Sequence, residues 1–286
     1  MTFTTVGVVG VGNIGCGVVV DLLLHGIHAV GVDVSAAELD RARRELLKAV
    51  RFAPLLQKGA PRLTPDQAMA RVTLTTDLEA VAGCQFIVEN IPEDWSLKEP
   101  LYHRLDEIAP AGVYFGANTS CIPIGRIAAA THRPDRVVGM HFMNPVYLKP
   151  TVEVIRGAAT SEATLVAVRE LFGQLKKQAI VVGDKPGFVS NRISHLFMNE
   201  AASVLEDGLA TAAQIDAIFK QCFGHKMGPL ETADLIGLDT VVRSLDVLYD
   251  AFQDPKFRCC PLLRQMVAEG KCGVKSGRGF YHYPCA

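Results

Sequence analysis

The segment Val-Gly-Val-Val-Gly-Val-Gly-Asn-Ile-Gly occupies residues 6–15 and joins a short apolar run to spaced glycines. Gly10 allows a sharp turn after a strand, and Gly12 lets the backbone approach a pyrophosphate closely. Gly15 lets a helix pack close to that strand, and the amino terminus of the helix attracts phosphate. The segment predicts the strand–turn–helix of a dinucleotide-binding fold, with candidate cofactor contacts at Gly10, Gly12, Asn13, Ile14 and Gly15.

Asp33 strengthens this prediction because it ends a second apolar run, residues 28–32, which follows a helix-compatible stretch at residues 15–24. A glycine string alone is weak evidence, but here it lies within a β-α-β pattern. A carboxylate at this position accepts hydrogen bonds from the adenosine ribose hydroxyls and repels a 2′-phosphate. Val34 supplies no cation that would attract such a phosphate. The predicted cofactor is therefore NAD rather than NADP.

Further short β-type runs follow, separated by helical or looped segments, at residues 72–75, 86–88, 113–117, 137–140, 152–155 and 179–182. This alternation predicts an α/β, Rossmann-type, doubly wound domain with a mostly parallel sheet. A basic amphipathic helix is expected at residues 36–56, and Thr64 is expected to cap another helix.

The character of the chain changes after Lys185. From Phe188 to Ala268 apolar residues recur at helical spacing without a clear strand. We expect an NAD-binding Rossmann domain at residues 1–185 and an all-α domain at residues 186–286 that carries substrate-binding and dimerisation functions. The helical domain is too small to cover its own apolar faces, which favours pairing with a second copy in a homodimer.

Composition narrows the classes of function. The 286 residues carry a formal net charge of -1, so the chain lacks the basic surface that nucleic acid or an anionic membrane requires. No run reaches eighteen uninterrupted apolar residues, and the amino terminus lacks the pattern of a signal peptide. The eight cysteines show no repeated C-x-x-C spacing, so they predict neither a metal site nor a disulfide framework. We expect a cytoplasmic protein with reduced thiols.

His141 and Glu153 lie within apolar stretches of the segment at residues 136–155. Each interrupts or ends an apolar run, which suggests a proton acceptor at a strand end with a carboxylate that orients it. A carboxylate partner keeps an imidazole basic. Glu153 is flanked by the apolar residues Val152 and Val154. A solvent-exposed strand would instead alternate polar and apolar residues, so this pattern disfavours one here.

Several motifs follow one another in an order that resembles the 3-hydroxyacyl-CoA dehydrogenase family over nearly the whole chain. Besides the glycine segment they are Asn-Thr-Ser-Cys-Ile-Pro-Ile (118–124), Gly-Met-His-Phe-Met-Asn-Pro (139–145), Val-Glu-Val-Ile (152–155), Lys-Pro-Gly-Phe-Val-Ser-Asn-Arg (185–192), Met-Gly-Pro-Leu-Glu-Thr-Ala-Asp-Leu-Ile-Gly-Leu-Asp (227–239) and Lys-Ser-Gly-Arg-Gly-Phe-Tyr (275–281). The resemblance implies NAD-dependent interconversion of an L-3-hydroxyacyl thioester and its 3-oxo product, as in fatty acid metabolism.

The same resemblance implies roles for individual residues. His141 would remove the hydroxyl proton while hydride leaves the same carbon for nicotinamide, and Glu153 would hold the imidazole in the required tautomer. Ser120 and Asn191 would donate hydrogen bonds to the substrate oxygen, with Asn191 on the first helix of the second domain. Cofactor contacts are implied for Glu93, Lys98, Asn118, Ser120, Asn144 and Lys275, and a dimer through the second domain.

The carrier of the acyl group stays open. In family members that act on CoA thioesters, a helical hairpin after the ribose-binding aspartate supplies a serine and a lysine to CoA, yet no matching serine occurs between Ala36 and Lys58. Five cations in this region fit either the CoA phosphates or an acidic acyl carrier protein: Arg43, Arg44, Lys48, Arg51 and Lys58. CoA is the default carrier, and the alternative is a short hydroxyacyl group on a carrier protein, such as a glyceryl group in secondary metabolism.

Two more distant functions fit the sequence less well. One is a free-acid dehydrogenase of the gulonate or 3-hydroxyisobutyrate type, and the latter uses a catalytic lysine in a glycine-rich helix, which this chain does not show. A non-enzymatic NAD-binding protein, either structural or a redox sensor, would not need His141, Glu153, Ser120 and Asn191. A sensor would also need an output module, and no DNA-binding motif occurs.

Overall fold

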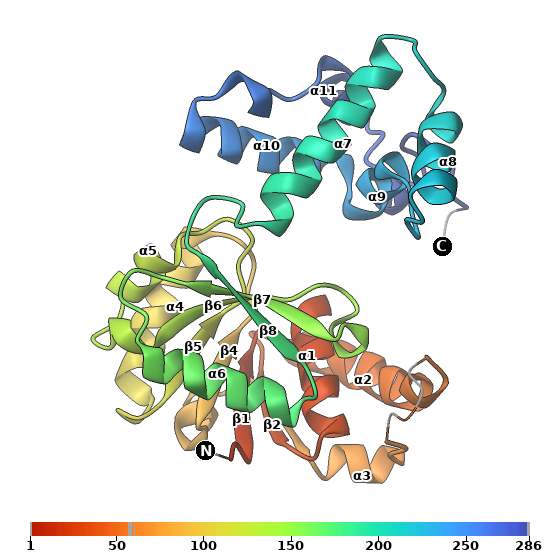
Figure 1. Ribbon diagram of the computed structural model, residues 1–286. Coiled ribbons are helices and arrows are strands. Elements are labelled where there is room, and N and C mark those ends of the chain that lie inside the picture. The colour runs from red at the N-terminus through yellow and green to blue at the C-terminus, as the bar shows by residue number, and fades with distance from the viewer. Residues whose placement is uncertain (1, 57–58, 60, 285–286) are drawn as a thin grey trace. The chain divides into compact units, whose positions relative to one another are not determined.

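The computed structural model describes residues 2–56, 59 and 61–284. Lys58, one of the five cations predicted to meet the acyl carrier, lies outside the described residues. The chain divides into two compact units, Met1–Lys185 and Pro186–Ala286 (Figure 1).

The first unit contains an eight-stranded sheet in the order β3-β2-β1-β4-β5-β6-β7-β8. All neighbouring strands pair in parallel except β6 and β7, which are antiparallel. The strands are β1 (Thr5–Val9), β2 (His28–Val32), β3 (Val72–Thr75), β4 (Phe86–Glu89), β5 (Tyr114–Ala117), β6 (Val137–His141), β7 (Thr151–Arg156) and β8 (Gln178–Gly183). Every predicted β-type run forms a strand, and the Rossmann-type, mostly parallel sheet is confirmed.

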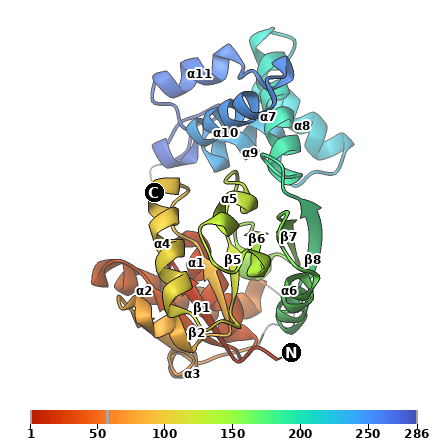
Figure 2. The same ribbon diagram turned by 90° about the vertical axis from the view of Figure 1, so that its left-hand side faces the viewer.

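Helices cover both faces of this sheet, with α4 and α6 on opposite sides (Figure 2). Apolar residues of α1 (Asn13–Leu24), α2 (Ala36–Leu56) and α6 (Glu162–Gln174) form one core with alternate strand residues such as Val8 and Val88. On the other face lie α4 (Trp95–Ile108) and α5 (Ile124–Ala129), where the Tyr102 ring meets Phe115 edge-on at 6.3 Å. Shorter elements are α3 (Pro65–Met69), capped by Thr64 as predicted, η1 (Leu78–Gly83), η2 (Pro134–Arg136) and η3 (Val146–Leu148).

The turn between β1 and α1 requires its glycines. Gly10 has a φ of +86°, and a Cβ on Gly15 would lie 1.8 Å from the Gly10 carbonyl oxygen. Strand β1 can therefore pass into α1 this tightly only with glycine at both positions. A Cβ on Gly12 would meet nothing within 4 Å, so the outer side of the turn is open.

The second unit is helical, as predicted. It contains α7 (Ser190–Glu206), α8 (Ala212–Cys222), α9 (Pro229–Ile236), α10 (Leu238–Phe252), α11 (Pro261–Ala268), η4 (Pro255–Phe257) and η5 (Val274–Ser276). Its core joins α7, α9 and α10 through Met198, Leu230 and Leu245, among others. Two buried carboxylates bind the segment at residues 280–281: Asp234 accepts hydrogen bonds from the backbone N–H groups of Phe280 and Tyr281, and Asp216 accepts one from the Tyr281 hydroxyl.

No helix among the described residues is both long and apolar enough to span a membrane.

Candidate functional site

The predicted cofactor turn lies at the carboxyl end of β1. Asp33, the residue after β2, accepts hydrogen bonds through Oδ2 from the Val11 N–H at 2.8 Å and through Oδ1 from the Val34 N–H at 2.8 Å. Its half-exposed carboxylate is thus fixed against the glycine turn. A cation of the basic helix at residues 36–56 also lies here, because the Arg41 guanidinium donates to the Val11 carbonyl at 3.3 Å.

The turn fits a dinucleotide pyrophosphate. Asn13 and Ile14 form the first turn of α1, and the residue that precedes this helix, Gly12, offers no side chain to cap it. The N–H groups of the first turn therefore have no side-chain acceptor from Gly12, and the open side of Gly12 leaves room for phosphate oxygens at the positive end of the helix.

Ser120, His141 and Glu153 form one continuous hydrogen-bonded chain. His141 ends β6 and pairs in register with Glu153 on β7, so the antiparallel geometry brings the two side chains together. His141 Nδ1 lies 2.9 Å from Glu153 Oε2, and His141 Nε2 lies 3.1 Å from Ser120 Oγ. His141 is only 5% exposed. Because an ionised Glu153 only accepts hydrogen bonds, the proton resides on Nδ1 and leaves Nε2 as an acceptor.

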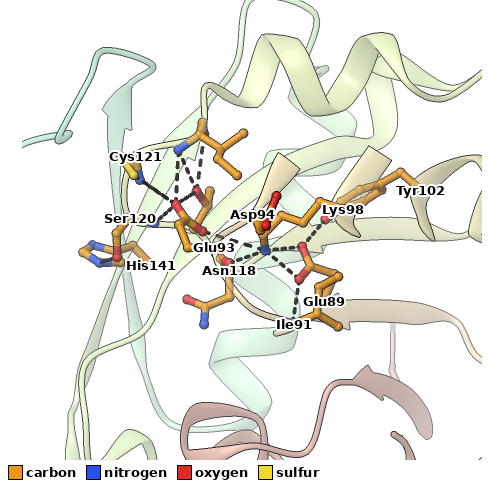
Figure 3. Close-up of polar contacts among 12 residues, drawn as sticks. Glu89, Ile91, Glu93, Asp94, Lys98, Tyr102, Asn118, Ser120, Cys121 and His141 are labelled. Carbon is orange, nitrogen blue, oxygen red and sulfur yellow. Dashed lines mark hydrogen bonds and ion pairs between the residues drawn. The ribbon is translucent and has the colours of Figure 1, made fainter. Parts of the chain in front are cut away.

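Glu93 organises the loop that carries Ser120 (Figure 3). Its Oε1 atom accepts hydrogen bonds from the Thr119 hydroxyl at 2.6 Å and from three successive backbone N–H groups, those of Ser120, Cys121 and Ile122, at 3.0, 2.9 and 3.2 Å. Burial by itself would raise the pKa of Glu93, but these hydrogen bonds and the charge of Lys98 outweigh it, so the pKa lies below its ordinary value. The ionised carboxylate thus holds the loop at residues 119–122 in one conformation.

Behind this loop lies a buried ion pair, Glu89 with Lys98 (Figure 3). Lys98 Nζ donates to Glu89 Oε1 at 2.6 Å and to Oε2 at 2.7 Å, and the Lys98 side chain has 0% exposure. Glu89 also accepts from the Ile91 N–H at 2.7 Å and the Tyr102 hydroxyl at 3.0 Å. Burial raises the pKa of Glu89, although the charge of Lys98 acts in the opposite direction. Lys98 was expected at the cofactor, and here its ammonium group reaches no open surface.

Sequence reasoning missed Glu89. The signal was present, since Glu89 ends the apolar run Phe-Ile-Val-Glu just as Asp33 follows residues 28–32. In a parallel sheet both positions lie at the carboxyl edge, where functional groups gather.

Asn118 connects the ends of three neighbouring strands. It follows β5, its N–H donates to the Glu89 carbonyl at the end of β4 at 2.9 Å, and its Oδ1 accepts from the N–H of Phe142, next to His141, at 3.3 Å. Its carbonyl oxygen accepts from Lys98 Nζ at 3.1 Å. The structure thus brings together Glu93, Lys98, Asn118, Ser120 and His141 at the carboxyl ends of β4, β5 and β6.

Three further predicted residues belong to other elements. Asn144 is exposed in the connection between β6 and β7. Asn191 lies in the first turn of α7, where its carbonyl is 2.8 Å from His195 Nδ1, and Lys275 lies in η5, paired with Asp239 at 2.5 Å. Both belong to the second unit, and their proposed roles stay predictions.

Among the described residues no group of three or more histidine, cysteine or acidic side chains is arranged to hold a metal ion.

Comparison with known proteins identifies relatives of the whole chain. Residues 5–185 match the family model described as 3-hydroxyacyl-CoA dehydrogenase, NAD binding domain, and residues 187–283 match the C-terminal domain of the same family.

Individual relatives agree with this match. The chain is 41% identical over 277 residues to a probable 3-hydroxybutyryl-CoA dehydrogenase of Deinococcus radiodurans, with 97% of this chain and 99% of the relative covered. It is 38% identical to a 3-hydroxybutyryl-CoA dehydrogenase of Bradyrhizobium diazoefficiens, with 97% and 94% covered. The crystal structure of (S)-3-hydroxybutyryl-CoA dehydrogenase from Ralstonia eutropha superposes with a TM-score of 0.93 at 38% identity, covering 99% of this chain and 100% of that one.

Proposed function

Since the chain belongs to the 3-hydroxyacyl-CoA dehydrogenase family and is an NAD-dependent oxidoreductase, we propose that it interconverts a short L-3-hydroxyacyl-CoA and its 3-oxo product. The observation that carries this proposal is the hydrogen-bonded chain Ser120–His141–Glu153 at the carboxyl edge of a dinucleotide-binding sheet. The names of the relatives, 3-hydroxybutyryl-CoA dehydrogenases, support a short acyl group and CoA as its carrier.

His141 acts as the general base of the proposed oxidation. Its Nε2 atom accepts the proton of the substrate 3-hydroxyl group, and the electron pair of that O–H bond forms the carbonyl as hydride leaves the same carbon. Bound NAD supplies the hydride acceptor. Glu153 keeps the Nδ1 proton in place and stabilises the imidazolium that forms, since the two groups are 2.9 Å apart. A positioned base of this kind accelerates such a step by about 10²- to 10⁴-fold.

Ser120 positions the substrate oxygen. Its hydroxyl lies 3.1 Å from His141 Nε2, so a substrate hydroxyl that hydrogen-bonds to both groups has a defined place. Asn191, on α7 of the second unit, is proposed as a further donor to the same oxygen. The residues proposed to contact the ribose and nicotinamide part of NAD are Glu93, Lys98, Asn118, Asn144 and Lys275.

The order serine, histidine, glutamate also occurs in enzymes that use serine as a nucleophile. Such enzymes need backbone N–H groups near the serine to stabilise an oxyanion. Here the N–H groups of Ser120, Cys121 and Ile122 are already engaged by Glu93. This occupation favours proton abstraction by His141 over acyl transfer to Ser120.

The acyl carrier is tested by comparing substrates. Four of the predicted cations, Arg43, Arg44, Lys48 and Arg51, are exposed on α2 and are suited to meet the phosphates of CoA. We expect NADH oxidation, followed by its absorbance, with acetoacetyl-CoA. Turnover only with a 3-oxoacyl group on an acyl carrier protein would replace CoA by the carrier protein, and absence of turnover with both would overturn the proposal.

The second unit is proposed to pair with a second copy of itself. Several of its large apolar side chains are exposed: Ile193, Leu209, Ile218, Phe223 and Leu235. Burial of such a set against a second copy removes apolar area from water.

A cytoplasmic location is proposed as well. The seven cysteines whose side chains the structure describes are free thiols, which suits a reducing compartment.

A further inference from the structure

We propose that Glu89, which no step of the reaction uses directly, is a positioning residue. Its buried carboxylate holds Lys98, and Lys98 in turn holds the start of the loop at residues 118–122 that presents Ser120 to His141. The catalytic consequence rests on the proposed function, whereas the effect on the loop does not.

The contacts of Glu89 identify it as an ionised group that is saturated with donors. Lys98 Nζ donates to both carboxylate oxygens, the Ile91 N–H donates to Oε1, and the Tyr102 hydroxyl donates to Oε2. A carboxylate can accept all four of these contacts, whereas a protonated acid would present a hydrogen to one of them. Glu89 therefore fixes the position of the Lys98 ammonium group relative to the Asn118 carbonyl.

Lys98 has three N–H donors, and three acceptors are present at hydrogen-bond distance. Two are the oxygens of Glu89, and the third is the carbonyl oxygen of Asn118 at 3.1 Å. That carbonyl belongs to the peptide group directly before Thr119. Its direction therefore sets the direction of the chain as it enters the loop.

From this point the loop converges on Glu93. The N–H groups of residues 120–122 all point to Glu93 Oε1, and Lys98 Nζ lies 3.9 Å from Glu93 Oε2. Lys98 thus stands between two carboxylates, one buried and one at the loop (Figure 3). The Lys98 side chain has no exposed surface, and its expected contact with the cofactor stays a prediction.

Stability alone does not explain this ion pair. A buried ion pair is often replaced by apolar side chains of similar volume at no loss of stability. An apolar pair would not orient the Asn118 carbonyl, because only a donor imposes a direction on an acceptor. Orientation of the loop is therefore the property that these two residues supply.

The test uses the double variant Glu89→Gln with Lys98→Met, which removes both charges of the pair at similar volume. Hydrogen–deuterium exchange of the amides of residues 120–122 is measured on the full chain. We expect exchange about tenfold faster than in wild type, because the anchor of the loop is lost. We also expect kcat to fall by about 10- to 100-fold, as for other residues that support a site from behind.

A matched control removes a second partly buried ion pair from the same helix. Asp106, in the last turn of α4, accepts from Arg133 Nε at 2.6 Å and does not contact the loop at residues 118–122. The variant Asp106→Asn with Arg133→Met should lower the melting temperature but leave exchange of residues 120–122 at the wild-type rate. An equal rise in exchange in this control would overturn the proposal, as would wild-type exchange in the Glu89/Lys98 variant.

A milder variant tests the effect of Glu89 on the loop if the double variant does not fold. Glu89→Asp retains both charges but withdraws the carboxylate from Lys98 by one methylene group. We expect a several-fold rise in exchange of residues 120–122, and an unchanged rate would overturn the proposal. If wild-type protein turns over no hydroxyacyl thioester, the proposed function fails, and the exchange comparison still decides the role of Glu89.

Discussion

Both nitrogens of the His141 ring are engaged, and this defines what the residue can do. Nδ1 faces Glu153 at 2.9 Å and Nε2 faces Ser120 at 3.1 Å, so the ring cannot rotate without losing a hydrogen bond. A ring held in this way presents one nitrogen lone pair in a fixed direction, as a general base requires.

Replacement of His141 by glutamine should abolish proton transfer while it leaves cofactor binding intact. We expect kcat with acetoacetyl-CoA to fall by about 10²- to 10⁴-fold, because glutamine accepts hydrogen bonds but not protons. The Kd of NADH, measured by fluorescence titration, should stay within about twofold. Turnover at the wild-type rate would exclude His141 as the base.

The cofactor preference is a second property of single residues. Asp33→Ala with Val34→Arg removes the carboxylate that repels a 2′-phosphate and adds a guanidinium for it, next to the Arg41 guanidinium that already lies at the turn. The ratio of kcat/KM for NADPH to that for NADH should rise by about tenfold or more. The single change Val34→Arg is the control, since it keeps the repulsion. If the ratio is the same in the double variant and in wild type, Asp33 does not contact the ribose.

At the scale of elements, the loop between β5 and α5 depends on one ionised carboxylate. The pKa of Glu93 is below its ordinary value near 4.5, because the hydrogen bonds from the loop and the charge of Lys98 outweigh the effect of burial. For a carboxyl group whose folded pKa is depressed, the stabilisation is fully present above the unfolded pKa and is lost as the pH falls through the folded pKa.

Glu93→Gln should therefore destabilise the protein in a pH-dependent way. At pH 7 we expect a loss of about 1 kcal/mol, or about 2–4 °C in melting temperature. The difference from wild type should shrink below pH 4.5 and vanish as wild-type Glu93 becomes protonated. Thermal unfolding between pH 3 and 7 measures this. Glu107→Gln, an exposed acid on α4 paired with Arg104, is the control and should show little change at any pH. A Glu93→Gln difference that stays constant down to pH 3 would contradict the assignment.

The same elements show how far the sequence can predict this structure. The strands could be predicted because each has a local sequence pattern, a few apolar residues between turn residues. The glycine turn is predictable for the same reason. That His141 and Glu153 act together was also predicted from the sequence. The antiparallel register of β6 and β7, which brings them into contact, was not. Glu89 was missed because its partners come from α4 and from the end of β5. Their convergence follows from the order of strands in the sheet rather than from any sequence pattern.

The whole molecule combines these elements with a second unit of different character. The first unit contains His141, Glu153 and the glycine turn, whereas Asn191 and Lys275 belong to the second unit, and the roles of both sets are proposals. The second unit also exposes large apolar side chains, among them Leu209 at 79% and Phe223 at 66%. Exposed apolar groups of this size are consistent with the interface proposed for this unit.

The last prediction concerns assembly. Wild-type protein should sediment with the mass of a dimer in analytical ultracentrifugation. Leu209→Ser with Phe223→Ser should weaken the dimer by about 30-fold or more in Kd, as expected when apolar anchors of an interface are removed. The fold should persist, because both side chains are already largely exposed within their own unit. Val166→Ser, an exposed apolar residue of α6 in the first unit, is the matched control and should leave the dimer intact. If the double variant dimerises as tightly as wild type, the interface lies elsewhere. If wild-type protein is a monomer, the proposal that the second unit pairs with a second copy is wrong.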